Sequence, residues 1–267
     1  MHVLFSLIGP GSLLAFIACV AVASYAQNLT GFAFSLILLG LLAVLRIVPI
    51  ADASNAATLL TLFNAWSYVR LHKPKPPWRL MRPALVASEV GVLAGVLLLG
   101  WLSHGTGLEW LRAILGVSIL ACAVLLVVQT QAQPAVSPPG SFAVAGGLSG
   151  VLGGLFSASG PPLVFHMYRQ PMDPLLIRAS LLVIFASNSA VRLVLVGASG
   201  QFSTLSLVLA ACAAPVVYAV GRFNYRYPVK MSPRDLRRLV AALLTVAGGS
   251  LLFSAGKALL AASQQLP

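Results

Sequence analysis

The chain has 267 residues, of which 59% are hydrophobic and 8% are charged, and its formal net charge is +12. Soluble proteins carry about 25% charged residues, so this composition excludes a soluble globular protein and indicates a chain that mostly faces lipid. The positive charges lie in short segments between apolar runs, as the positive-inside rule describes, which argues against nucleic-acid binding.

Ten apolar runs follow one another along the chain, and the seventh is about half the length of a membrane span. They occupy about 10–28, 31–48, 53–69, 83–103, 109–129, 141–157, 161–168, 174–197, 204–220 and 237–260. We therefore expect an all-α membrane protein, a polytopic helical bundle of about ten segments with broken or re-entrant helices, forming a single transmembrane domain over 1–267. The first run ends like a signal peptide but lacks a basic region before it, which favours a first span.

The Pro-rich stretch 130–140 divides the runs into two groups of five, repeat one at about 10–129 and repeat two at about 141–260. Similar residues recur in the same order in both groups, at spacings of 124 and 125 residues: Asn64 with Asn188, and Leu111-Arg112 with Leu236-Arg237. This order predicts an internal repeat.

The distribution of charge tests the repeat, because an odd number of crossings in each half inverts the second half. If the basic loop 70–82 is cytoplasmic, counting crossings places 13 Lys and Arg residues inside and 3 outside, the latter being Arg46, Arg112 and Lys257. The pattern predicts two inverted five-segment repeats in a bacterial inner membrane, with both termini periplasmic.

The Gly-rich run 146–162 interrupts the second half at a depth where unpaired backbone is costly. Ser159 is suited to cap a new helix whose first turn contains Pro161. The free N–H groups and the dipole of such a helix favour an anion. We expect Ser157, Ser159 and Gly160 to bind the substrate; tight helix packing through small residues is the alternative.

A polar cluster, Gln27-Asn28-Leu29-Thr30-Gly31, interrupts the first half in a similar position. Buried polar side chains are costly without partners, and Asn28 or Thr30 is expected to cap a helix that starts near Phe32. Two facing breaks predict a central substrate site between two positive helix ends, to which Gln27, Asn28, Thr30 and Gly31 contribute. The alternative is a short loop between ordinary spans.

Arg192 is a cation within the run 174–197, one helical turn from Asn188 on the same side. Three roles fit it: bidentate substrate binding, an ion pair with Glu89, or snorkelling to an interface. Glu89 is a candidate proton carrier or a structural partner, and His166 either lines the pathway or packs in the core. Asn64 and Asn188 either line the pathway or form hydrogen bonds between helices.

The three cysteines lie inside apolar runs without CxxC spacing, and we expect no metal and no cofactor. The run ending in Gly160-Pro161-Pro162-Leu163, followed by a short helix and by Ile177-Arg178-Ala179-Ser180, resembles the second repeat of the TauE/SafE sulfite exporter family, also called the toluene sulfonate uptake permease family. The resemblance covers nearly the whole chain. The first break departs from the family, whose members often have a Gly-rich, Pro-containing segment there.

The resemblance implies a secondary transporter of small sulfur-containing anions, such as sulfite, thiosulfate or organosulfonates, that works by alternating access. A coupling proton or sodium ion and a homo-oligomer stay open, and another organic anion is an alternative substrate. An intramembrane enzyme is also an alternative, because Ser159 lies in a rhomboid-like sequence. That chemistry needs a histidine on a later helix, whereas the last histidine is His166. The remaining alternative is a scaffold subunit without transport.

Overall fold

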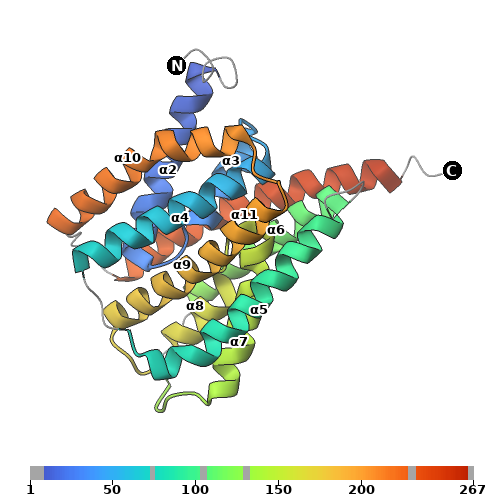
Figure 1. Cartoon of the computed structure of the whole chain (residues 1–267). Helices are drawn as coiled ribbons and strands as arrows, with labels where there is room; N and C mark the ends of the chain where they lie inside the picture. Colours follow the sequence, from blue (N-terminus) through green and yellow to red (C-terminus); the bar gives the residue numbers. More distant parts are fainter. Residues whose placement is uncertain (1–8, 73–75, 103–106, 129–132, 228–232, 264–267) are drawn as a thin grey trace.

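The computed structural model describes residues 9–72, 76–102, 107–128, 133–227 and 233–263. Within these ranges the regular secondary structure is entirely α-helical (Figure 1). The helices are α2 (Pro10–Thr30), α3 (Phe34–Leu45), α4 (Ile50–His72), α5 (Trp78–Leu102), α6 (Gly107–Val128), α7 (Pro139–Phe156), α8 (Pro161–Tyr168), α9 (Pro174–Ala198), α10 (Thr204–Arg226) and α11 (Pro233–Ser263).

Six candidate membrane spans occur among the described residues. They are α2, α5, α7, α9, α10 and the Val240–Lys257 part of α11, each long and apolar enough to cross a bilayer. The helix α3 is apolar but shorter, and α8 has 8 residues. The chain is therefore a multi-pass helical membrane protein, as its composition predicts.

The helices pack in two connected series. In the first, neighbours follow the order α2, α10, α4, α9, α5, α7, and in the second the order α3, α11, α6, α8. Figure 1 shows α10, α4, α9 and α5 lying one beside another across the molecule. The five helices of the first half, α2 to α6, can be paired in chain order with the five of the second half, α7 to α11. If every helix is replaced by its paired helix, each packing order is reproduced in reverse.

The tightest packing joins α5 to α7 through small residues. Gly146, Gly150 and Gly154 recur every fourth residue on α7, so they share one face of that helix. A Cβ atom at Gly150 would lie 2.8 Å from the Cα of Ser88 on α5. The packing interpretation of the Gly-rich run therefore applies to its helical part, which lies before the break at Ser157.

Replacing Gly150 by alanine is expected to lower the free energy of unfolding by about 1–3 kcal/mol, because the added methyl group overpacks the α5–α7 contact. Gly147 is the matched control, since a Cβ there would meet its nearest atom, the carbonyl oxygen of Ala87, at 3.7 Å. Gly147→Ala is expected to leave stability unchanged or slightly raised. Equal thermal midpoints for the two purified variants would contradict the packing described.

The start of α4 differs from the sequence prediction, in which the apolar run begins at about residue 53. The helix begins at Ile50, directly after Pro49, and Asp52 occupies its first turn, where a negative charge is favourable. The Asp52 carboxylate accepts hydrogen bonds from Ser203 and Ser206 at the start of α10. The residues at the start of α10 thereby hold the start of α4.

Candidate functional site

Both halves of the chain contain a broken helix that ends in the same way. Gly31 follows α2 with φ of 85° and donates its N–H to Gln27 O at 2.7 Å. Ser157 follows α7 with φ of 57° and donates its N–H to Gly153 O at 2.8 Å. A left-handed residue closing the last turn is a common helix stop, so each break has a defined geometry.

The predicted side-chain caps of the helices after the breaks are wrong. Asn28 and Thr30 lie in the last turn of α2, where the Thr30 hydroxyl donates to Ala26 O at 2.7 Å. The residue before α3 is Ala33, and the residue before α8 is Gly160; neither helix has a side-chain cap. The Ser159 hydroxyl instead accepts a hydrogen bond from Asn188 Nδ2.

The first-turn N–H groups of these two helices consequently lack partners. Within the described residues, the backbone N–H groups of Ser35, Leu36 and Leu163 have no protein acceptor. Unpaired N–H groups and the positive end of the helix dipole together favour a negatively charged ligand. The breaks thus provide two anion-favouring helix ends.

A small cavity of about 20 Å³ lies between the two breaks. Its lining comprises Gln27, Phe32, Ala33, Phe34, Ser35, Leu36, Thr61, Ser157, Ala158, Ser159, Gly160 and Phe185. A water molecule needs about 10–15 Å³ measured in this way, so this central cavity has room for about one water. Both broken segments and both helix ends therefore meet at this one small cavity.

Four of the ten predicted binding residues line the central cavity: Gln27, Ser157, Ser159 and Gly160. Sequence reasoning missed Ser35 and Thr61, whose hydroxyl oxygens lie 3.4 Å apart across the α3–α4 contact. Thr61 precedes Asn64 by three residues, so helical spacing would have placed it on the same face of α4. The other predicted residues lie around the cavity without lining it.

The hydroxyl of Ser157 is the most informative polar group in the cavity. This side chain is 7% exposed and lines the cavity, and its Oγ atom is buried without a hydrogen-bond partner. A buried hydroxyl without a partner costs about 1–3 kcal/mol. Such a group at the meeting point of two helix ends is typical of a site that a ligand completes.

Asn64 and Asn188 make equivalent contacts in the two halves. Asn64 Nδ2 donates to Gln27 Oε1 at 2.7 Å, and Asn188 Nδ2 donates to Ser159 Oγ at 3.2 Å. Each asparagine thereby connects a long helix to the neighbouring break. Because Gln27 Oε1 is engaged, the amide nitrogen of Gln27 is the end that can donate to a ligand.

Arg192 is fully buried, at 1% exposure, and joins three helices. Its guanidinium donates to Gly154 O on α7 at 3.0 Å. It also donates to three side chains of α4, at distances between 2.6 and 3.2 Å: Ser54, Asn55 and Thr58. Snorkelling is excluded by this burial, and all four acceptors are neutral, so they leave the positive charge uncompensated.

The proposed ion pair between Arg192 and Glu89 does not form. Glu89 Oε1 accepts a hydrogen bond from Ser187 Oγ at 2.5 Å, while its Oε2 is buried without a partner. Next to this contact, Ser88 Oγ donates to Asn188 Oδ1 at 2.8 Å. Glu89 therefore belongs to the α5–α9 contact and lies outside the cavity lining.

His166 lies at the far end of α8 from the break. Its Nε2 is 3.3 Å from Ser141 Oγ, and its ring packs edge-on against Phe142 with 4.5 Å between ring centroids. It therefore packs against the start of α7 and does not contact Ser159. Ser159 and His166 therefore do not form the Ser–His pair that an intramembrane serine hydrolase needs.

The first break is also held from outside the cavity, by residues near the α8–α9 connection. Tyr168 donates its hydroxyl to Thr30 O at 2.7 Å. Gly31 packs so closely on Arg178 that an added Cβ would lie 2.6 Å from Arg178 Cγ. A side chain at Gly31 is excluded by this contact as well as by its positive φ.

The chain is similar to known membrane transport proteins over most of its length. The family model for the sulfite exporter TauE/SafE matches residues 16–251. The probable sulfite/organosulfonate exporter TauE of Cupriavidus necator is 33% identical over 238 residues, covering 89% of this chain and 93% of that protein. The probable inner membrane transporter protein TsaS of Comamonas testosteroni is 25% identical over 175 residues, covering 65% of this chain and 72% of that protein. No solved structure gives a significant match.

Proposed function

The chain belongs to the sulfite exporter TauE/SafE family, and from this premise we propose that it is a secondary transporter of sulfite, thiosulfate or small organosulfonates. The family and the relatives' names indicate a membrane transporter and not an enzyme. The central cavity is the proposed substrate site, and small sulfur oxyanions are the ligand class that its N–H and hydroxyl donors suit.

One observation carries this proposal: Ser157, whose buried hydroxyl has no hydrogen-bond partner, lines a cavity that lies between two helix N-termini. An oxyanion has several acceptor oxygens and supplies what the Ser157 hydroxyl, the Gln27 amide and the first-turn N–H groups lack. Arg192 adds an uncompensated positive charge near this point, because its partner Thr58 lies one turn before the lining residue Thr61 on α4. In a low-dielectric interior the attraction between this positive charge and an anion one helical turn away is only weakly screened.

We propose alternating access built on two inverted repeats. The cavity holds about one water, whereas sulfite has a sulfur atom and three oxygens, so the described conformation is closed and must widen to accept the substrate. The palindromic packing orders, the matching breaks and the equivalent Asn64 and Asn188 contacts support the repeat. Movement of one repeat against the other would then open either side of the site.

The deciding experiment is uptake of labelled sulfite, thiosulfate and a short alkanesulfonate into proteoliposomes that contain the purified protein. We expect saturable uptake of at least one of these anions, and competition by the others, over protein-free liposomes. A folded protein that transports none of them would contradict the proposed substrate class. Ligand-dependent thermal stabilisation by the same anions separates failed transport from failed binding.

The inverted topology predicts that both termini are periplasmic. A reporter fused after Pro267 that is active in the periplasm is expected to give signal, while one inserted in the loop 70–82 is expected to give none. The basic loop is retained inside by the positive-inside rule. A cytoplasmic reporter signal after Pro267 would contradict five crossings per half while leaving the substrate proposal untouched.

Glu89 is the proposed proton carrier, if transport is proton-coupled, because one of its carboxylate oxygens lacks a partner at the α5–α9 contact. Glu89→Gln is expected to abolish stimulation of uptake by an imposed pH gradient while preserving exchange of internal for external sulfite. The matched assay is counterflow, in which internal and external sulfite exchange without net movement of protons. Retained pH-gradient stimulation in the variant would exclude Glu89 from coupling.

A further inference from the structure

A second pocket lies at the other end of α3 and shares no residue with the central cavity. It has a volume of about 710 Å³, within the range of small-molecule sites. Its lining comprises Leu42, Ala43, Arg46, Ile47, Val48, Pro49, Ile50, Arg112, Leu251, Ser254 and Lys257. The lining therefore combines three cations with apolar side chains, and we call it the basic pocket.

The three cations of this pocket come from distant parts of the sequence. Arg46 follows α3, Arg112 is on α6 and Lys257 is on α11. They are also the three basic residues that the charge-based topology places on the outer side, against 13 placed inside. In this predicted topology the outer side of the membrane has few cations, and all three of them line the basic pocket.

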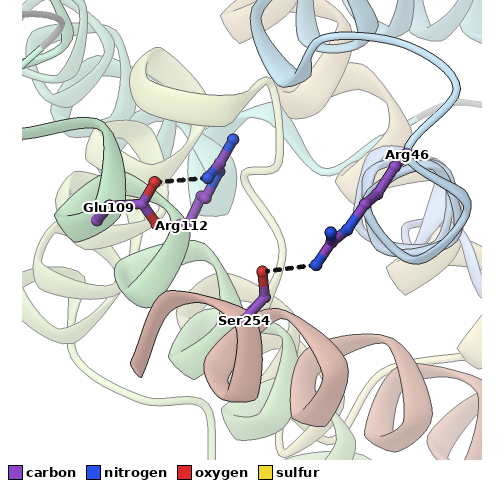
Figure 2. Close-up of polar contacts among 4 residues, drawn as sticks. All are labelled: Arg46, Glu109, Arg112 and Ser254. Atoms are coloured by element: carbon purple, nitrogen blue, oxygen red, sulfur yellow. Dashed lines mark hydrogen bonds and ion pairs between the residues drawn. The ribbon is translucent and has the colours of Figure 1, made fainter. Parts of the chain in front are cut away.

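Two of the three charges are not neutralised by the contacts described. Figure 2 shows Arg46 extending from the end of α3 toward Ser254 on α11, to whose hydroxyl it donates at 3.4 Å. Lys257 lies over the ring of Phe253, 4.6 Å from its centroid. Arg112 pairs with Glu109 at 2.5 Å. The pocket therefore retains positive charge that can attract an anion.

The backbone at Arg46 gives independent support. Arg46 has φ of 53° and its N–H closes the last turn of α3 on Leu42 O at 2.8 Å. A long side chain is rare in this left-handed conformation, where glycine or asparagine is preferred. Non-glycine residues in such conformations cluster at functional sites. Arg46 thus occupies a position where its own backbone conformation is unfavourable.

The depth of the pocket identifies the kind of anion. The first residues of α3 line the central cavity and its last residues line the basic pocket. The 12 residues of α3 span about 17 Å at 1.5 Å per residue, close to half of a hydrocarbon core about 30 Å thick. With the central cavity at the middle of the bilayer, as the proposed function has it, and α3 crossing one leaflet, the basic pocket would meet the interface, where a charged head group and an apolar chain can both be accommodated.

We propose that the basic pocket binds an amphiphilic anion, with a sulfonate or phosphate group near Arg46 and Lys257 and an apolar part against the side chains of α3 and α11. Two sources share this chemistry: an organosulfonate, and the head group of an anionic phospholipid. Sulfite lacks the apolar part and would leave most of the pocket empty. This binding site stands apart from the central cavity and does not depend on transport through it.

Thermal stabilisation of delipidated protein in a neutral detergent tests the proposal. The probes are hexanesulfonate and dihexanoyl phosphatidylglycerol, with hexanol and dihexanoyl phosphatidylcholine as uncharged and zwitterionic counterparts. We expect at least one anionic probe to stabilise the protein more than its counterpart. Preference for hexanesulfonate assigns the pocket to organosulfonates, and preference for phosphatidylglycerol assigns it to lipid; stabilisation by neither overturns the proposal.

Charge-removing variants locate the binding. Arg46→Gln and Lys257→Gln are each expected to raise the dissociation constant of the anionic probe about tenfold, because a hydrogen bond to a charged group is lost. Both residues are exposed, so neither change should prevent folding. Arg222→Gln, an exposed cation of α10, is the matched control and is expected to bind as the unmodified protein does. An equal loss in that control would overturn the site.

A chemical probe distinguishes this pocket from the central cavity. With the native cysteines replaced by alanine, Ser254→Cys places a thiol in the lining of the basic pocket. We expect the bound anionic probe to slow its modification by a methanethiosulfonate reagent, while saturating methanesulfonate, a small sulfonate that does not react with this reagent, does not. A probe that binds without protecting this thiol would place the binding elsewhere. Sulfite transport is measured separately, so its failure would not affect this result.

Discussion

Arg192→Lys is expected to lower the free energy of unfolding by about 3 kcal/mol, because it breaks a fully buried polar junction. The guanidinium reaches Gly154 O on α7 and three side chains on α4 from opposite sides. An ammonium group retains the charge but lacks the planar fork that spans both helices. Acceptors left without a donor at this depth each add to the loss.

The two functions of Arg192, charge and connection, separate in a pair of variants. Arg192→Lys is expected to retain part of the sulfite uptake of the folded fraction, since its charge still favours an anion in the central cavity. Arg192→Met removes the charge as well and is expected to abolish uptake. Arg222→Lys is the control on an exposed surface. Unchanged thermal stability of Arg192→Lys would contradict the three-helix junction.

Ser157→Gly is expected to raise stability while weakening transport. Glycine tolerates the φ of 57° better than serine does, and the change removes a buried hydroxyl without a partner. We expect a gain of about 0.5–1 kcal/mol in the free energy of unfolding. The apparent KM for sulfite is expected to rise about tenfold or more, as for the loss of one hydrogen bond to a charged ligand.

Ser180→Ala is the matched control for this prediction. The Ser180 hydroxyl is also fully buried without a partner, but it does not line the central cavity. Its removal is expected to leave the KM for sulfite unchanged. A normal KM in Ser157→Gly, or the same increase in both variants, would show that the Ser157 hydroxyl does not contact the substrate.

The membrane class and the positions of the breaks could be predicted because both depend on local composition. A run of apolar residues has few alternatives to a membrane helix, and the polar or Gly-rich interruptions at Gln27 and Ser157 mark where it stops. The prediction placed four of the residues that line the cavity. These residues lie at the breaks themselves, where sequence position alone brings them to the site.

The contacts between distant helices could not be predicted in the same way. Arg192 was assigned three alternative roles, and its actual partners on α4 lie more than 130 residues away. Ser35 and Thr61 are small polar residues of a common kind. They line the cavity only because α3 packs against α4, which the sequence around them does not indicate. The predicted caps were wrong because Ser159 and Thr30 found other partners. The local propensity of serine favours a helix cap, but it contains no information about Asn188, which lies on a different helix.

The size of the central cavity has a consequence for measured affinity. A closed form with room for one water cannot bind sulfite, so only the fraction of molecules with a widened cavity binds. If that fraction is about 1%, the apparent dissociation constant is about 100 times the intrinsic one. A variant that loosens the closure would raise this fraction and would therefore bind sulfite more tightly. Weak apparent binding is therefore what a well-formed site of this kind should show.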